Sequence, residues 1–230
     1  MSTSPTLAGG PPPRRLRIFA SPVFWAVVVL CAVAVPGVRV LITKRAAAEL
    51  PVLGTLPTFT LTDQNGAAFG TGQLEGRVWV ANFIFTRCPT ICPAFTRKMY
   101  RVQQSAKDLA PALHLVSFSV DPDYDKPEVL KAYAQTHGAD TSMWSFLTGD
   151  PAAIQKTVVD GLKVSMGRSG DADDVNSIFH GTHFVLVDGQ MRIRGYYRSE
   201  DDAEVQRLLT DLRALVESSP SRALAARSGR

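Results

Sequence analysis

The chain has 230 residues, an ordinary globular composition and a formal net charge of +4, which fits one domain with appendages. Residues 1–50 carry a net charge of +5 and residues 218–230 a net charge of +3, so the stretch between them carries −4. A nucleic-acid-binding domain would need its basic charge on the folded part. This distribution excludes nucleic acid as the expected partner.

The N-terminal segment is expected to anchor the protein in a membrane. Residues 1–17 contain three consecutive prolines and three arginines, which predicts a disordered basic tail. Residues 18–42 form an apolar stretch that matches the roughly 20 residues needed to cross a bilayer, and we interpret them as one transmembrane helix. Cys31 lies in this stretch and is expected to act as a small apolar residue. The alternative is a cleaved signal peptide, because the small residues Ala46–Ala48 follow.

A linker over residues 43–52 leads into the main domain, which is predicted to cover residues 53–217. Residues 218–230 are expected to form a second disordered basic tail. The domain begins with a predicted hairpin, whose strands Phe59–Thr62 and Ala67–Phe69 are joined at Asn65-Gly66.

The next stretch, Val78–Phe85, is almost continuously apolar, which predicts a strand buried on both faces of a mostly parallel sheet. Pro93 to about Leu109 has the apolar spacing of a helix. The remaining predicted elements are strand His114–Val120, helix Glu128–His137, strand Trp144–Leu147, helix Pro151–Leu162, the hairpin strands Phe184–Val187 and Met191–Tyr197, and helix Asp201–Val216.

This order predicts a thioredoxin-like α/β domain with a central sheet and flanking helices. Functional sites in such sheets form at the carboxyl ends of strands. Cys88 stands three residues beyond one predicted strand end, and it is therefore the first candidate for a functional residue.

Cys88 and Cys92 are the two cysteines of the segment CPTIC, and three cysteines in all are too few for a disulfide framework. Pro93 suits a first helical position, so we expect the pair in the loop that enters the helix. A helix N-terminus stabilises thiolate, and thiolates are the ligands that Cu(I) prefers. The spacing also permits a disulfide. A metal role and a redox role are equally supported by the spacing, and an inert or structural pair is the third interpretation.

A histidine would complete a metal site, and the chain offers four. His114, early in a strand, and His137, at a helix end, are expected to be structural or solvated. His180 follows the polar stretch Gly167–Ser177 and precedes a strand, from where its side chain can reach over the sheet edge. His183, three residues later, could bind a metal equally well, and the position of the two histidines in the sequence does not choose between them.

Three acidic residues, Asp121, Asp123 and Asp125, follow the strand that begins at His114. Short acidic side chains favour turns and helix N-termini, so we expect them to cap a helix or order a turn. A role beside a metal or at a partner surface is the other interpretation.

Three segments together resemble the Sco/SenC family, namely FIFTRCPTICP (Phe83–Pro93), SVDPDYDKPEVLKAYA (Ser119–Ala134) and HGTHFVLVDG (His180–Gly189). The likeness covers about Leu53 to Val216 and includes the preceding apolar segment.

The copper-binding cysteines of the family fall on Cys88 and Cys92. Its histidine, four residues before an apolar strand, falls on His180. His183 is additional to the family pattern, and the usual proline-aspartate after this strand is shortened here to Asp188-Gly189.

The resemblance implies a membrane-anchored chaperone that binds copper, as Cu(I), Cu(II) or both, and delivers it to the dinuclear copper centre of cytochrome c oxidase. This would be a binding and delivery function and not enzymatic turnover. The implied partners are the copper-bearing oxidase subunit and other copper chaperones. The implied location is the inner membrane, crossed once, with the domain in the periplasm or the mitochondrial intermembrane space.

The resemblance also allows a thiol–disulfide reductant that keeps the copper-site cysteines of the oxidase reduced, which would need Cys88 and Cys92 but not His180. Thioredoxin-type oxidoreductases carry a cis-proline facing their cysteine pair, and no proline occurs between Pro151 and Pro220. A peroxidase of the same fold is a third candidate, because Thr86 and Arg87 precede Cys88. A structural zinc site would need a fourth ligand, which His183 could supply.

Overall fold

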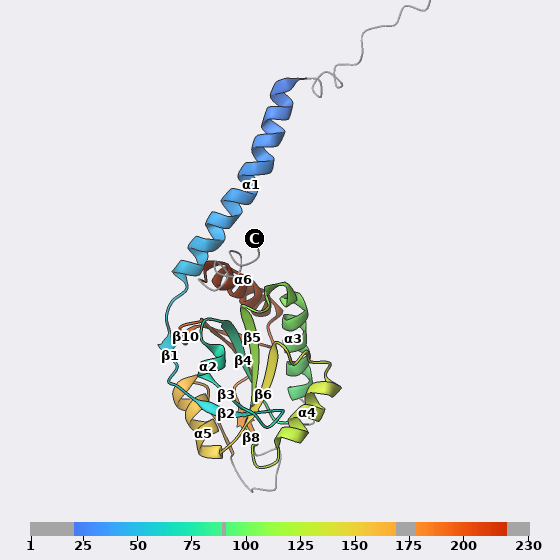
Figure 1. The fold of residues 1–230 in the computed structure, drawn as a ribbon, viewed down its shortest axis with the longest axis vertical. Helices are drawn as coiled ribbons and strands as arrows, with labels where there is room; N and C mark the ends of the chain where they lie inside the picture. The colour runs from blue at the N-terminus through green and yellow to red at the C-terminus, as the bar shows by residue number, and fades with distance from the viewer. Residues whose placement is uncertain (1–20, 89–90, 169–177, 220–230) are drawn as a thin grey trace, which may run out of the picture. The chain divides into compact units, whose positions relative to one another are not determined.

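The structure is a computed structural model that describes residues 21–88, 91–168 and 178–219 (Figure 1). The chain divides into two compact units, Met1–Thr43 and Lys44–Arg230. Helix α1 (Pro22–Glu49) makes up the described part of the first unit and continues into the second.

Within the residues described, no helix is both long and apolar enough to cross a membrane. The predicted transmembrane helix over residues 18–42 is therefore not confirmed. The predicted tail at residues 1–17, and the other tail from residue 220 on, lie outside the described residues.

The second unit is built on a mixed eight-stranded sheet with the order β1-β10-β9-β4-β5-β6-β2-β3. Its strands are β1 (Gly54–Thr55), β2 (Thr60–Asp63), β3 (Ala68–Gly70), β4 (Val78–Ile84), β5 (Leu113–Ser119), β6 (Trp144–Thr148), β9 (His183–Val187) and β10 (Arg192–Arg198). Only the β4–β5 and β5–β6 pairs of this sheet are parallel. The prediction of a mostly parallel sheet is therefore wrong, because two hairpins with short turns contribute antiparallel pairs at both sides of the parallel centre.

The remaining elements are helices and one small sheet. The helices are α2 (Thr71–Leu74), α3 (Ile91–Ser105), α4 (Pro127–Thr136), α5 (Pro151–Gln155) and α6 (Asp202–Ser218), with a 3-10 turn η2 (Lys107–Leu109) and a π-helical turn η3 (Lys156–Gly161). The small sheet pairs β7 (Met166–Arg168) with β8 (Ile178–His180).

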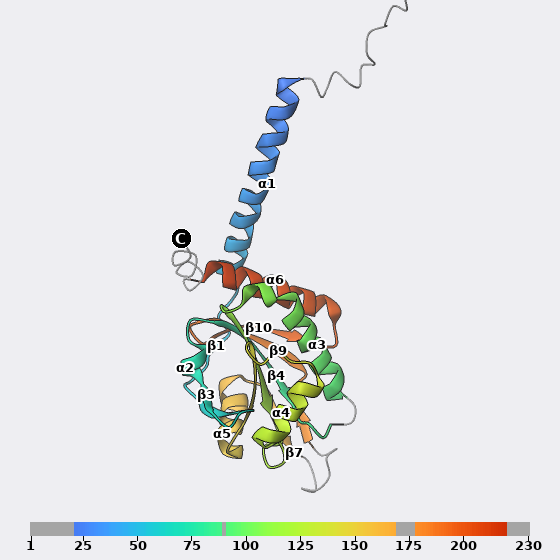
Figure 2. The ribbon, with the colours of Figure 1, turned by 45° about the vertical axis from the view of Figure 1, so that its right-hand side comes forward.

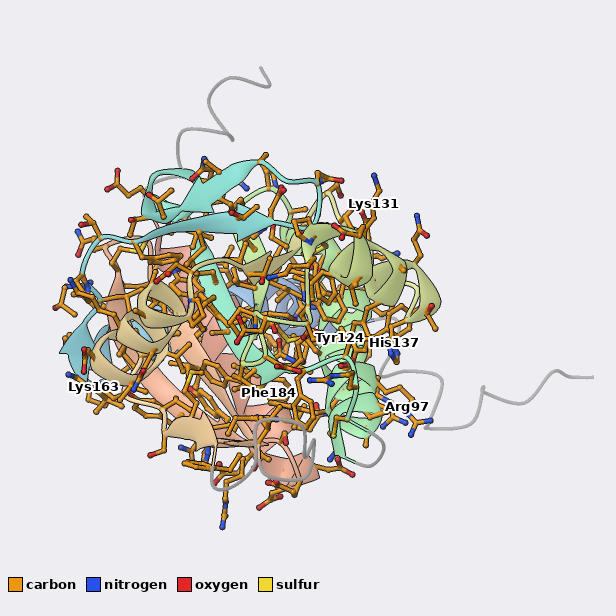
Figure 3. The ribbon with its side chains drawn as sticks, turned by 90° about the horizontal axis from the view of Figure 1, so that it is seen from below. Arg97, Tyr124, Lys131, His137, Lys163 and Phe184 are labelled. Atoms are coloured by element: carbon orange, nitrogen blue, oxygen red, sulfur yellow. The ribbon has the colours of Figure 1, made fainter. Side chains whose placement is uncertain are left out.

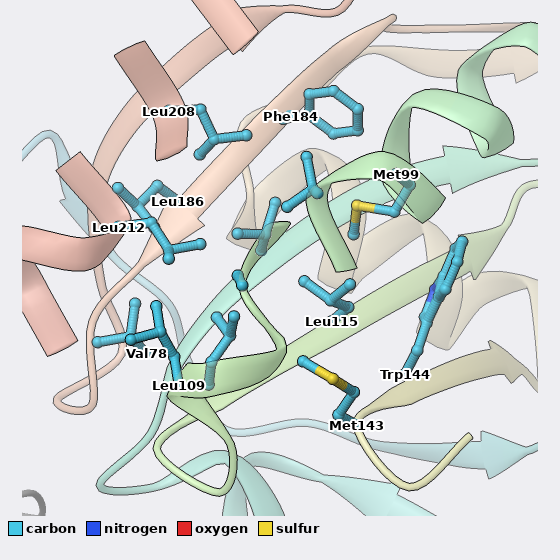
Figure 4. Packing of buried hydrophobic residues seen from close by; sticks show 14 of the residues in the cluster. Val78, Met99, Leu109, Leu115, Met143, Trp144, Phe184, Leu186, Leu208 and Leu212 are labelled. Atoms are coloured by element: carbon cyan, nitrogen blue, oxygen red, sulfur yellow. The ribbon is translucent and has the colours of Figure 1, made fainter. Parts of the chain in front are cut away.

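Two hydrophobic clusters fill the two faces of the large sheet. Because successive strand side chains point to opposite faces, Val78 and Val80 of β4 pack under α3, α4 and α6, whereas Trp79 and Ala81 pack under α2, α5 and η3. Figures 1 and 2 show helices on both sides of the sheet, and Figure 4 shows the first cluster, with Phe184 between Leu208 and Met99. All seven residues of β4 are buried, as predicted for a central strand.

The first predicted hairpin is confirmed. Gly66 has a φ of +79°, a conformation that a glycine adopts without steric cost. The Asp63 side chain accepts hydrogen bonds from the backbone N–H groups of Asn65 and Ala67, at 2.8 and 2.9 Å. An aspartate that bonds to its own turn in this way fixes the direction of the chain.

The other predicted strands and helices are confirmed within a few residues, with three differences. Helix α3 begins at Ile91, so Cys92 and Pro93 lie in its first turn, where the missing proline N–H has no intrahelical partner to lose. Helix α1 extends to Glu49 into the predicted linker, and strand β1, which was not predicted, follows the linker and pairs with β10. The predicted helix Pro151–Leu162 is α-helical only to Gln155 and then π-helical.

Candidate metal centre

Cys88 lies in a tight turn just beyond the carboxyl end of β4. Burial continues from β4 through Phe85, and Cys88 itself is 8% exposed. Its backbone N–H donates to the Phe85 carbonyl at 3.2 Å, which closes the turn. Its side chain belongs to the same hydrophobic cluster as Phe85, Val120 and Ile178. The thiol is thus held in a largely dry environment at the end of the central strand.

His180 ends β8, and its ring meets Phe85 edge to face, with the ring centroids 5.8 Å apart. The sheet explains this meeting. Strand β9 runs antiparallel to β4, with Val187 opposite Trp79 and Val185 opposite Ala81, so the residues before β9 lie at the carboxyl end of β4. The structure therefore brings His180 to the residue that precedes Cys88 by three positions.

The surroundings of the His180 imidazole favour its neutral form. Burial lowers its pKa, and a hydrogen bond to the Gly181 carbonyl only partly offsets that effect. Nδ1 lies 3.2 Å from the Gly181 oxygen, so it carries the proton and donates. The lone pair then sits on Nε2. Histidine ligands of metals commonly donate their other N–H to a carbonyl in this way.

Cys92 is the second residue of α3, but its side chain lies outside the described residues. Among the side chains that are described, no group of three or more His, Cys, Asp and Glu residues stands close enough to hold a metal ion. The predicted set of Cys88, Cys92 and His180 therefore stays a prediction. The chemistry of this donor set, two sulfurs and a neutral imidazole, suits copper.

The other histidines lie in different surroundings. His114 is buried, its Nε2 is 3.0 Å from Ser145 Oγ, and its ring stacks on Phe69. His137 caps the end of α4 with its ring 4.3 Å from that of Tyr133. Both are structural, as expected. His183 begins β9 opposite Arg198. The pKa of Glu200 is lowered mainly by a hydrogen bond with Thr182, and the charge of His183 adds to this lowering.

Two buried carboxylates tie the turn before Cys88 to the segment after β5. Arg87 donates from Nε and Nη2 to Oδ2 of Asp121, at 3.1 and 2.6 Å, and its guanidinium lies 4.2 Å from the Tyr124 ring centroid. Thr86 donates its backbone N–H and its hydroxyl to Asp125. These contacts account for Thr86 and Arg87 beside Cys88 without peroxidase chemistry.

The turn after β5 is closed by its own backbone, whereas the Asp121 and Asp125 carboxylates bond to Arg87, Thr86 and Ser119. The backbone N–H groups of Tyr124 and Asp125 both donate to the Asp121 carbonyl, at 3.1 and 2.9 Å. Burial raises the pKa of Asp125, and the hydrogen bonds from Ser119 and Thr86 oppose that rise. Figure 3 shows this end of the domain, with Tyr124 and Phe184 near its middle and Lys163 and Lys131 towards its margins.

Comparison with known proteins identifies the family. The family model described as SCO1/SenC matches residues 51–217. This chain belongs to the SCO1/SenC family. Among its relatives, the SCO1 protein homolog of Bacillus subtilis (strain 168) is 31% identical over 157 residues, which cover 68% of this chain and 80% of the relative.

Solved structures of SCO1/SenC proteins share the fold. A SCO1/SenC family lipoprotein from Bacillus anthracis is 38% identical, with a TM-score of 0.66 over 73% of this chain and 98% of that one. Bradyrhizobium japonicum ScoI with copper bound is 26% identical, with a TM-score of 0.60 over 70% and 99%. BsSco is described as a member of the Sco family of cytochrome c oxidase assembly proteins in which a disulfide switch was identified. It is 29% identical, with a TM-score of 0.63 over 72% of this chain and 95% of that one. The predicted thioredoxin-like α/β fold is confirmed at this level.

Sequence reasoning on this SCO1/SenC chain missed how the site is supported. It named Thr86, Arg87 and Asp125 separately, but it did not connect the first two to the acidic turn. It also missed Phe85 as the contact of His180. The signal in the sequence was that the two segments directly follow the predicted strands Val78–Phe85 and His114–Val120, and the structure shows these strands paired with Ile84 opposite Ser119. Residues that follow two paired parallel strands meet at the same sheet edge.

Proposed function

We propose that this protein binds copper through Cys88, Cys92 and His180 and delivers it to the dinuclear copper centre of cytochrome c oxidase. The family membership supports this proposal, because one related structure holds copper and another relative is described as an oxidase assembly protein. Copper is the cargo in this proposal, so these residues hold the ion for delivery and do not form a catalytic centre.

One observation carries the proposal, which is the contact between His180 and Phe85 at the end of β4. It joins a neutral imidazole to the turn that holds the Cys88 sulfur, although the two residues lie far apart in the sequence. A soft thiolate set favours Cu(I), and an imidazole suits copper in both oxidation states. Three protein ligands leave the ion accessible for exchange with the ligands of a partner.

The proposed function also implies where the protein is located in the cell. The apolar residues 18–42 anchor the chain in the inner membrane with one pass, and the domain faces the periplasm or the mitochondrial intermembrane space. The partners are the copper-bearing subunit of the oxidase and other copper chaperones. The structural relative described as a lipoprotein supports a membrane-associated protein of this kind.

The first experiment compares His180→Ala with His137→Ala in the full chain in detergent. Removal of a ligand is expected to weaken copper binding at least about tenfold, whereas His137, which packs on Tyr133, is expected to be dispensable for binding. Stoichiometry and affinity are measured anaerobically by competition with a chelator. An unchanged affinity in folded His180→Ala would remove His180 from the site.

A thiol–disulfide reductant is the second candidate function, because α3 places Cys92 in its first turn, where the helix N-terminus stabilises thiolate. In that reaction the two thiols become a disulfide, and two electrons and two protons reduce a disulfide of the partner. Oxidase assembly in cells separates the two functions. A chaperone loses activity in both Cys88→Ser and His180→Ala, whereas a reductant loses it only in Cys88→Ser.

A further inference from the structure

Asp125 is a fully buried carboxylate that the proposed copper ligands do not include. It lies in the turn between β5 and α4 and is 0% exposed. Oδ1 accepts from the Thr86 hydroxyl at 2.5 Å, and Oδ2 accepts from the Thr86 backbone N–H at 3.1 Å and from the Ser119 hydroxyl at 2.6 Å. A buried carboxylate is costly unless such donors surround it.

The hydrogen bonds of the Asp125 side chain lie where the paired strands β4 and β5 both end. Ser119 is the last residue of β5 and stands opposite Ile84, the last residue of β4. Thr86 follows two residues later and precedes Cys88 by two. Asp125 therefore crosslinks the two strand ends to the chain that leads into the cysteine turn.

Thr86 lies beyond the strand ladder, because β4 ends at Ile84. The Asp125 carboxylate takes the place of a neighbouring strand and accepts the Thr86 N–H instead. Two residues on, the Cys88 N–H donates back to the Phe85 carbonyl. The direction of the Cys88 side chain thus depends on a backbone that is fixed at Thr86.

We propose that Asp125 is a positioning residue for the metal site, which acts through Thr86 to fix the Cys88 sulfur before copper arrives. This inference rests on the proposed copper function. Preorganised ligands bind more tightly, because less freedom is lost on binding. Asparagine in its place has one acceptor oxygen and a donating amide, so it cannot accept all three hydrogen bonds from Thr86 and Ser119 as the carboxylate does, and the turn can adopt other conformations.

Asp188 provides a matched control. It is also a buried carboxylate, 5% exposed, and it accepts hydrogen bonds from Arg192 and Arg194. It follows Val187, which stands opposite Trp79 near the start of β4, at the far end from Cys88. Both Asp125→Asn and Asp188→Asn thus remove a buried charge, but only the first touches the cysteine turn.

The test measures Cu(I) affinity of the full chain in detergent, with thermal unfolding to confirm that each variant is folded. Asp125→Asn is expected to lose at least about tenfold in affinity, as supporting residues of metal sites do, and Asp188→Asn to stay within about twofold. Thr86→Ser keeps both donors and is expected to retain the affinity, whereas Thr86→Val loses the hydroxyl donor and is expected to weaken it. A folded Asp125→Asn with normal affinity, or an equal loss in Asp188→Asn, would overturn the inference.

A second measurement does not depend on copper. Hydrogen exchange of the Thr86 amide in the metal-free protein is expected to accelerate at least about tenfold in Asp125→Asn, while the amides within β4 and the Thr86 amide of Asp188→Asn stay unchanged. Unchanged exchange at Thr86 would overturn the positioning role. If the wild-type protein bound no copper, the proposed function would fail, and the exchange experiment would still decide whether Asp125 fixes the turn.

Discussion

His114 is a histidine that folding keeps uncharged. It is 4% exposed, and burial, assisted by the charge of Arg77, lowers its pKa to about 4. Its Nε2 pairs with Ser145 Oγ. In the part of the chain that the structure describes, Nδ1 has no hydrogen-bond partner. Protonation would therefore add a charge and a donor to a site that offers Nδ1 no acceptor.

The lowered pKa of His114 predicts how stability depends on pH. Between about pH 6.5, the ordinary pKa of histidine, and pH 4, the unfolded chain binds a proton at His114 and the folded chain does not. The free energy of unfolding should therefore fall as the pH is lowered through this window and level off below it. A pKa difference of 1 corresponds to about 1.4 kcal/mol, so the lowering from 6.5 to about 4 limits the loss to about 3.5 kcal/mol.

The measurement is urea unfolding of wild type and His114→Gln at several pH values. Glutamine can keep a polar partner for Ser145 but does not titrate, so the variant should lack this share of the pH dependence. Other groups titrate in both proteins and cancel in the difference. Parallel curves for the two proteins from pH 7 to pH 4 would contradict the assignment.

Single residues differ in how far the sequence could identify them. Cys88 and His180 are predicted as ligands from their motifs, and the structure places His180 against Phe85, whose carbonyl closes the turn to Cys88. The partnership of Thr86 with Asp125 spans 39 positions and depends on the register of two strands. A motif shows which residue types are present, but a hydrogen bond across elements requires their three-dimensional arrangement.

At the scale of elements, the turn between β9 and β10 packs backbone to backbone against the turn before β4. The Gly76 N–H donates to the Gly189 carbonyl at 2.9 Å. A side chain at Gly189 would bring its Cβ to 2.8 Å from the Gly76 carbonyl carbon. This close approach gives a physical reason for a glycine in the shortened Asp188-Gly189 turn.

Gly189→Ala is therefore expected to destabilise the domain by about 1–3 kcal/mol, because backbone atoms cannot move aside as a flexible side chain can. Gly72→Ala is the control, since an added Cβ at this helical position meets nothing within 4 Å. Alanine favours a helix over glycine, so this variant should be as stable as wild type or slightly more stable. Thermal unfolding of both variants measures the contrast, and equal melting temperatures would refute it.

The elements that the sequence did not predict are those whose shape depends on a distant segment. A Cβ on Gly161, at the end of η3, would lie 2.6 Å from Leu56 Cδ1, so η3 packs closely on the residue after β1. Strand β1 itself exists because Gly54 and Thr55 pair with β10. Apolar periodicity reports on local structure, and it carries no information on such long-range packing.

At the scale of the whole molecule, the proposed ligands differ in how far apart they lie in the unfolded chain. Cys88 and Cys92 are four residues apart and stay close in any conformation, whereas His180 lies far along the chain. Folding brings His180 to the end of β4 through the antiparallel pairing of β4 with β9. The sequence could predict the fold class and the candidate ligands, but this meeting depends on the sheet topology.

This difference predicts how copper changes the stability of the molecule. A ligand stabilises the folded state only to the extent that it binds the unfolded chain less well. The unfolded chain still offers copper the two adjacent thiols, so the added stabilisation of the folded protein comes mainly from His180. Copper at about 100 times its Kd is expected to contribute up to about 2.7 kcal/mol, and each kcal/mol raises the melting temperature by roughly 2–4 °C in a chain of this size.

Unfolding is followed anaerobically, with and without Cu(I), in wild type, His180→Ala and His137→Ala. Wild type and His137→Ala should show the same rise in melting temperature with copper, because His137 packs on Tyr133 of its own helix. His180→Ala should show a much smaller rise even when it still binds copper through its thiols. An equal rise in all three would mean that copper is held by the cysteine segment alone, and that the folded sheet contributes no imidazole to the site.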